Sequence, residues 1–223
     1  MTRQPGTDVL SPVDVMLRLR TATAPEHQQL EDTLDLLSPD LTPGRLAAVL
    51  QRMHAYWAAV EAGLDAWAAA HPAAATALDW AARRRTHLFT ADLAALGAAP
   101  LPDRPTDVGP PAGTDEALGT LYVLEGSTLG GVFIDRHLAA LPALAGVGPL
   151  AAFSPYGERT GARWAAFRRA TRDHVAHGGG DADAVVSAAG RTFRSMAAWC
   201  RDVQQSASPT TASTTHPGGG VPA

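Results

Sequence analysis

The chain has 223 residues, which is enough for one domain of ordinary size with a sizeable core. Its formal net charge of −4 argues against a nucleic-acid partner, and the absence of lysine excludes Schiff-base chemistry. Its one cysteine, Cys200, excludes an internal disulfide and is predicted to be a small buried side chain. No apolar run reaches the roughly 18 residues of a membrane span, and the first twelve residues do not resemble a signal peptide. We therefore expect a cytoplasmic protein without a membrane anchor.

The chain is predicted to be all-α, because alanine, leucine and arginine recur at helical spacing and alternating β-branched runs are absent. Residues 1–11 are expected to form a flexible N-terminus, and residues 12–205 a single multi-helix domain. Residues 206–223 are rich in Ser, Thr, Pro and Gly, a composition typical of a disordered tail.

About six helices are expected. The first covers roughly 12–36 and is interrupted near Pro25, because proline lacks the N–H of a helix interior. The second begins at Thr42 as N-cap with Pro43 in the first helical position, and ends near Ala70. The other predicted segments are a helix up to Leu96 stopped by Gly97, a proline-rich loop over 98–113, a helix capped by Thr114 that ends before Pro142, an irregular stretch over 143–156, a helix over 158–177, and a last helix from Asp181 or Asp183 to about Gln205.

Glycines interrupt the apolar helical run that follows Thr114. Gly126, Gly130 and Gly131 lie within six residues, and each glycine in a helix interior costs about 1 kcal/mol relative to alanine. Because Gly126 and Gly130 are four residues apart, they share one face of a helix. That face is bare backbone, against which a flat molecule can lie or at which the helix can kink.

His27 is the best supported of the eight histidines as a ligand. Glu31 lies one helical turn further on, where a carboxylate can accept the Nδ1–H and leave Nε2 free for a metal. Arg20 lies two turns earlier on the same side. On spacing alone, an exposed His–Glu pair on an amphipathic helix is the favoured interpretation.

Other chemistries find less support. A di-iron site needs Glu-x-x-His on two helices, and none of the six glutamates is followed by histidine at that spacing. Ser127 has no histidine near it in sequence, so a serine hydrolase has no support. The run Arg83-Arg84-Arg85 is expected to be a solvated face that could attract an acidic protein.

Two segments together resemble the haem oxygenase family, in particular its bacterial, biliverdin-producing branch. The first is Leu19-Arg20-x-x-Thr23-x-x-x-His27-x-x-Leu30-Glu31, which is similar to the proximal-helix pattern. The second is Tyr122-Val123-Leu124-Glu125-Gly126-Ser127-Thr128-Leu129-Gly130-Gly131, which is similar to the distal-helix pattern. The resemblance implies a haem oxygenase-like helical bundle over most of residues 12–205.

The resemblance also implies roles for single residues. His27 would be the axial ligand of the haem iron and Glu31 its hydrogen-bond partner. Arg20, Tyr122 and, in a looser match, Arg168 would hold the haem and its propionates. The distal face would be lined by Gly126, Ser127, Gly130 and Gly131. The sequence departs from many family members at Ser127, where they carry an aspartate. Pro25 also places Arg20 outside the helix that bears His27.

The activity implied is the oxidative opening of haem to biliverdin, Fe²⁺ and CO, with haem as both substrate and cofactor. The chain has no Gly-x-Gly-x-x-Gly fingerprint, so an external electron donor such as a ferredoxin system would be required. A bacteriophytochrome is a possible bilin acceptor by resemblance alone. Two alternatives stay open: a haem carrier or sensor that uses the same His27 site without turnover, and a helical protein without haem whose glycines serve close packing.

Overall fold

The computed structural model describes residues 14–201, and every regular element in that range is helical. The predicted flexible N-terminus and the predicted tail over 206–223 lie outside the described residues. The elements are α1 (Val15–Ala22), α2 (Ala24–Leu34), α3 (Pro43–Ala70), α4 (Pro72–Ala77), η1 (Trp80–Arg83), α5 (Thr86–Ala95), α6 (Thr114–Gly126), η2 (Ser127–Leu129), α7 (Gly131–Ala140), η3 (Pro142–Leu144), η4 (Gly157–Arg159), α8 (Thr160–His177) and α9 (Ala182–Cys200).

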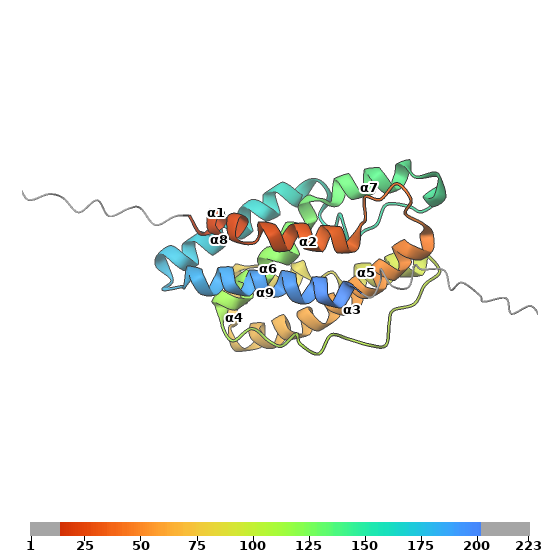
Figure 1. The fold of residues 1–223 in the computed structure, drawn as a ribbon. Coiled ribbons are helices and arrows are strands. Elements are labelled where there is room, and N and C mark those ends of the chain that lie inside the picture. Colours follow the sequence, from red (N-terminus) through yellow and green to blue (C-terminus); the bar gives the residue numbers. More distant parts are fainter. Residues whose placement is uncertain (1–13, 202–223) are drawn as a thin grey trace, which may run out of the picture.

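Helix α9 organises the bundle (Figure 1). It packs most extensively against α6 and also contacts α1, α2 and α3. The α6–α9 crossing is close because Gly119 has no side chain: a Cβ added there would lie 2.3 Å from the carbonyl oxygen of Val185. Cys200 is fully buried at the end of α9, as predicted. Burial raises the pKa of its thiol to about 12, so this cysteine is an inert core residue.

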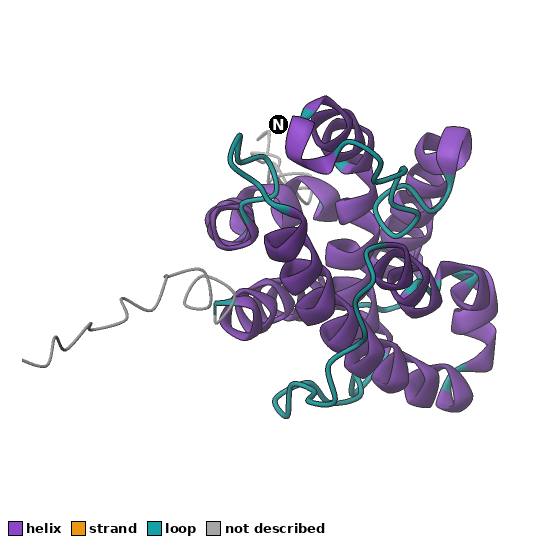
Figure 2. Ribbon diagram, turned by 90° about the vertical axis from the view of Figure 1, so that its right-hand side faces the viewer, coloured by secondary structure: helices purple, strands orange, loops and turns teal. Residues whose placement is uncertain are grey.

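The core is filled by large apolar side chains from helices far apart in sequence, and Figure 2 shows the helices gathered around it. The largest fully buried aromatic side chains are Tyr56, Trp57 and Trp67 of α3, Phe89 of α5 and Phe167 of α8. The burial of Phe89 explains why α5 is retained although a helix of this length is not stable alone in water.

Several predicted helix boundaries are confirmed. The first helix is interrupted as expected: Thr23 separates α1 from α2, and Pro25 lies in the first turn of α2, where its missing N–H breaks no bond. Thr42 caps α3 by accepting a hydrogen bond from Arg45 N at 3.2 Å. Asp181 caps α9 in the same way, accepting from Asp183 N at 2.8 Å.

Other boundaries were predicted wrongly. The continuous helix expected up to Leu96 is three elements, α4, η1 and α5, because Asp79 adopts a left-handed conformation with φ of 51°. Thr114 is the first residue of α6 rather than its cap, which is Gly113. The glycine-bearing helix is also divided, since η2 separates α6 from α7.

Within residues 14–201, one segment, Thr114–Ala140, is long and apolar enough to cross a membrane by length and composition. Half of its most apolar window is buried inside the protein, and η2 interrupts it. These properties are those of a core helix of the bundle.

Candidate functional site

The predicted ligand His27 lies on α2 and is open to solvent, with 53% of its side chain exposed. Its Nδ1 lies 3.6 Å from Glu31 Oε2, close enough for an ion pair but longer than a hydrogen bond. On its other side the ring meets Phe193 of α9 edge to face, with centroids 5.5 Å apart. The structure therefore brings His27 and Glu31 together and orients the imidazole against α9.

Tyr122 of α6 lies beside the start of α2. Burial raises the pKa of its phenol, while a hydrogen bond with Thr23 and the positive charge of Arg20 oppose that rise. Arg20, at the exposed end of α1, is thus outside the helix of His27 but close to Tyr122. His27 follows one helical turn after Thr23, and its backbone N–H donates to Thr23 O at 2.9 Å.

A second contact joins the same two regions further along. His137 Nε2 of α7 lies 3.0 Å from the carbonyl oxygen of Ser38, just beyond α2. Thr23 and Ser38 lie on either side of α2 in the chain, and their partners Tyr122 and His137 lie on either side of η2. The two contacts therefore join the segment that contains α2 to the segment that contains η2. Between these points α2 makes its main contacts with α9 rather than with α6 or α7.

The four predicted distal residues divide into two kinds. A Cβ added to Gly126 would meet nothing within 4 Å, and one added to Gly130 would meet only Ser127 O at 3.9 Å. A Cβ on Gly131 would instead lie 2.0 Å from Phe153 O, so this glycine is required by packing. The Ser127 hydroxyl is directed inward, donating to Leu124 O at 2.7 Å. The open face of this turn is therefore formed by Gly126 and Gly130.

Arg168 is half-buried on α8, and its Nε is buried with no hydrogen-bond partner among the described residues. The preceding turn of α8 carries Trp164, whose ring centroid lies 5.8 Å from that of Tyr122. Helix α8 therefore reaches the same region as Arg20 and Tyr122, although no contact of Arg168 with either residue is observed.

The expectation of a solvated face at Arg83-Arg84-Arg85 was wrong. Arg83 and Arg85 are 5% and 2% exposed, and only Arg84 faces solvent, paired with Asp65. Arg83 forms a buried ion pair with Glu125, and Arg85 donates to Leu124 O and, at 3.0 Å, to Ser127 Oγ. A charge run usually lies on a solvated face, and these partners are about 40 residues away, so no local signal predicted the burial.

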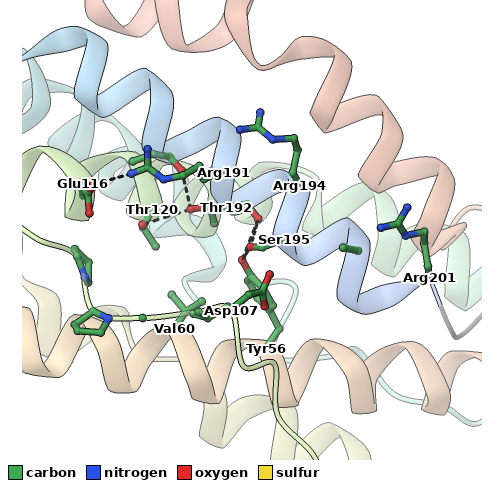
Figure 3. A pocket seen from close by; sticks show the side chains of 16 residues that line it. Tyr56, Val60, Asp107, Glu116, Thr120, Arg191, Thr192, Arg194, Ser195 and Arg201 are labelled. Carbon is green, nitrogen blue, oxygen red and sulfur yellow. Dashed lines mark hydrogen bonds and ion pairs between the residues drawn. The ribbon is translucent and has the colours of Figure 1, made fainter.

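A cavity of about 640 Å³ lies apart from the predicted residues, between α3, α6 and α9 and behind the loop 107–111 (Figure 3). Its polar groups bond mainly to one another. Tyr56 donates to Thr192 O at 2.9 Å and lies 2.6 Å from Ser195 Oγ, while Arg191 pairs with Glu116 at 2.7 Å. None of the sequence-predicted site residues lines this cavity.

Comparison with known proteins identifies the fold of this chain through a solved structure rather than through sequence. No family model matches the chain, and no curated protein matches it in sequence. Among solved structures, the chain is similar to the NO- and CO-bound haem oxygenase from Neisseria meningitidis, with a TM-score of 0.62 and 21% identity. The match covers 86% of this chain and 92% of that one. The chain has the all-α fold of a haem oxygenase. This confirms the predicted fold class.

Proposed function

We propose that the chain is a haem oxygenase that opens haem to biliverdin, Fe²⁺ and CO. The observation that carries the proposal is the pair of contacts that brackets α2 and η2. These contacts support the proposal because they tie the chain on both sides of α2, which bears the exposed His27, to α6 and α7, which flank the bare backbone of Gly126 to Gly130. A flat disc with an iron at its centre needs a ligand on one face and room for dioxygen on the other.

The chemical groups of these residues also suit haem. His27 would ligate the iron through Nε2, with Glu31 beside Nδ1 to orient the ring and strengthen its donation. Arg20, Tyr122 and Arg168 would hold the propionates, and the unpartnered buried Nε of Arg168 supports this assignment. Gly126 and Gly130 would let the distal backbone approach the iron, while Gly131 keeps η2 packed on Phe153.

Haem supplies the redox centre and is itself the substrate that is oxidised. The protein binds and orients it, and the distal backbone together with ordered water would deliver protons where no distal histidine stands. The Ser127 hydroxyl is engaged by Leu124 O and Arg85, so Ser127 would act on the open face through its backbone and through Arg85. Electrons would come from an external donor such as a ferredoxin system.

The cellular setting is part of the proposal. We propose a cytoplasmic enzyme whose bilin product passes to an acceptor such as a bacteriophytochrome.

An aerobic turnover assay tests the proposed reaction. The protein is loaded with hemin and supplied with ferredoxin, ferredoxin reductase and NADPH. Loss of the Soret band with growth of a red-absorbing bilin, and release of CO, is the result expected. A ferrous-oxy spectrum that persists through the assay would contradict turnover and identify a haem carrier, and failure to form a Soret band at all would contradict haem binding.

A further inference from the structure

A cluster of buried charges supports the distal turn from inside the protein. Its members are Arg83, Arg85, Glu61 and Glu125, each no more than 8% exposed, with Tyr156 beside them. Two positive and two negative side chains balance one another there. Even a well-paired buried ion pair adds little net stability, because removing both charges from water costs about as much as their attraction returns. This cluster therefore calls for a reason beyond stability.

Glu125 connects this cluster to the open face. Its Oε2 pairs with Arg83, and its Oε1 accepts a hydrogen bond from the Tyr156 hydroxyl at 2.8 Å. Burial and the neighbouring carboxylate raise the pKa of Tyr156 to about 12, so the phenol stays a donor. The residue that follows Glu125 is Gly126, whose missing side chain leaves the turn open on its other side.

The same carboxylate acts on Arg85. Burial lowers the pKa of Arg85, and the charge of Glu125 is the largest influence that opposes this shift. Arg85 in turn holds both ends of one helical turn, through Leu124 O and Ser127 Oγ. Glu125, Arg83 and Arg85 thus fix the backbone on either side of Gly126. Their charges also set the electrostatic potential on the inner side of this turn.

We propose that Glu125 is a positioning residue for haem chemistry: with Arg83 and Tyr156 it fixes the turn of residues 126–130 from inside, and its negative charge offsets Arg85 beneath the open face. This inference rests on the proposed function, because it concerns the face on which haem and its diatomic ligand would lie. The proposal has a positional half, that Glu125 fixes the turn, and an electrostatic half, that its charge offsets Arg85. The positional half concerns the protein without haem and can be measured separately.

Two variants separate charge from position. Glu125→Gln keeps the shape of the side chain and removes its charge. The double variant R83M/E125M removes both charges of the pair, and replacing a whole buried pair with apolar side chains is often neutral or stabilising, so it is expected to fold. Glu116→Gln is the control, because it removes the same charge from an ion pair on α6 that is partly exposed to solvent.

The first measurement is the C–O stretching frequency of CO bound to ferrous haem. Loss of the Glu125 charge leaves Arg85 less compensated, and a more positive potential draws electron density into the antibonding orbital of CO. Glu125→Gln is expected to lower the frequency, while Glu116→Gln leaves it unchanged. A merely structural role would not produce this shift in an isosteric variant, so an unchanged frequency in folded Glu125→Gln would overturn the electrostatic half.

The second measurement is amide hydrogen exchange over residues 126–130 in the protein without haem. R83M/E125M is expected to exchange there on the order of tenfold faster, while α3 and α9 keep their protection, because local openings report local anchoring. Unchanged exchange would overturn the positional half. If the wild-type protein formed no haem complex, the proposed function would fail, and the exchange experiment would still decide whether Glu125 positions the turn.

Discussion

The two sides of the candidate haem site are built in opposite ways. On the α2 side, His27 is more than half exposed, and the helix is held to α9 by an ion pair between Glu26 and Arg194 at 2.9 Å. On the α6 side, the open face of Gly126 and Gly130 is backed by buried charges. The contrast indicates that the imidazole is presented by a surface helix, whereas the proposed distal backbone is fixed by the interior. Disturbing the two sides should therefore have different consequences.

The largest effect is expected from breaking the buried support. Arg83→Met leaves the Glu125 carboxylate buried without its ion-pair partner, which costs about 3–5 kcal/mol of unfolding free energy for pairs of this kind. Denaturant unfolding of the protein without haem measures the change. Arg84→Met is the matched control, since Arg84 is half exposed and is expected to change stability by less than about 1 kcal/mol. Equal losses in the two variants would contradict the distinction between buried and exposed arginines.

The neighbouring glycines provide a second contrast within the distal turn. Gly131→Ala places a Cβ where it would be 2.0 Å from Phe153 O, so a loss of about 1–3 kcal/mol or more is expected. Gly130→Ala would meet only Ser127 O at 3.9 Å, and the φ of −79° at this position suits alanine, so stability is expected to change by less than about 0.5 kcal/mol. Thermal unfolding of both variants measures this difference. If Gly130→Ala were the more damaging substitution, the assignment of the open face would be wrong.

A larger side chain at the open face should affect haem rather than folding. Gly130→Leu is expected to weaken haem binding by on the order of tenfold or more. The free protein should keep its stability, because the φ of −79° at Gly130 is open to any residue and a Cβ there would meet only Ser127 O at 3.9 Å. A Soret titration measures affinity. Gly161→Leu on α8 serves as control, since a Cβ there would meet nothing within 4 Å. Normal haem affinity in Gly130→Leu would place the substrate elsewhere.

The smallest effect is expected on the α2 side. Glu31→Gln should leave haem bound but lower the iron–histidine stretching frequency, because a neutral partner near Nδ1 makes the imidazole a weaker donor. Resonance Raman spectroscopy of the ferrous complex measures it. Asp32→Asn removes the same charge from a residue that bonds to Gln28, and should leave the frequency unchanged. An identical frequency in Glu31→Gln and the wild type would argue against the pairing.

Much of the fold could be predicted where local chemistry sets it. Thr42 and Pro43 are a helix start that needs no tertiary partner, and the predicted span of α3 agrees with the structure. The break between α4 and η1 could not be predicted, because Asp79 adopts its left-handed conformation without a glycine or proline to mark it. Local sequence also left Thr114 indistinguishable from a cap, although Gly113 holds that position.

The candidate site shows the same division. His27 and Glu31 could be proposed from their spacing on one helix together with the family resemblance, and Tyr122 from the resemblance alone. The buried arginines Arg83 and Arg85 could not, because their partners are brought to them only by the packing of α3, α5 and α6. Gly130 and Gly131 are both glycines, so the sequence could not distinguish their roles. Only the packing of Phe153 against Gly131 shows that this glycine is required by close contact.

The central claim is that the imidazole of His27 binds the haem iron opposite the open face of Gly126 and Gly130. Hemin titration of His27→Ala, followed by addition of free imidazole, tests it most directly. The account predicts that the wild-type Soret spectrum is lost in the variant and returns when imidazole enters the space left by the side chain. A His27→Ala protein that binds hemin with the wild-type spectrum before imidazole is added would contradict it.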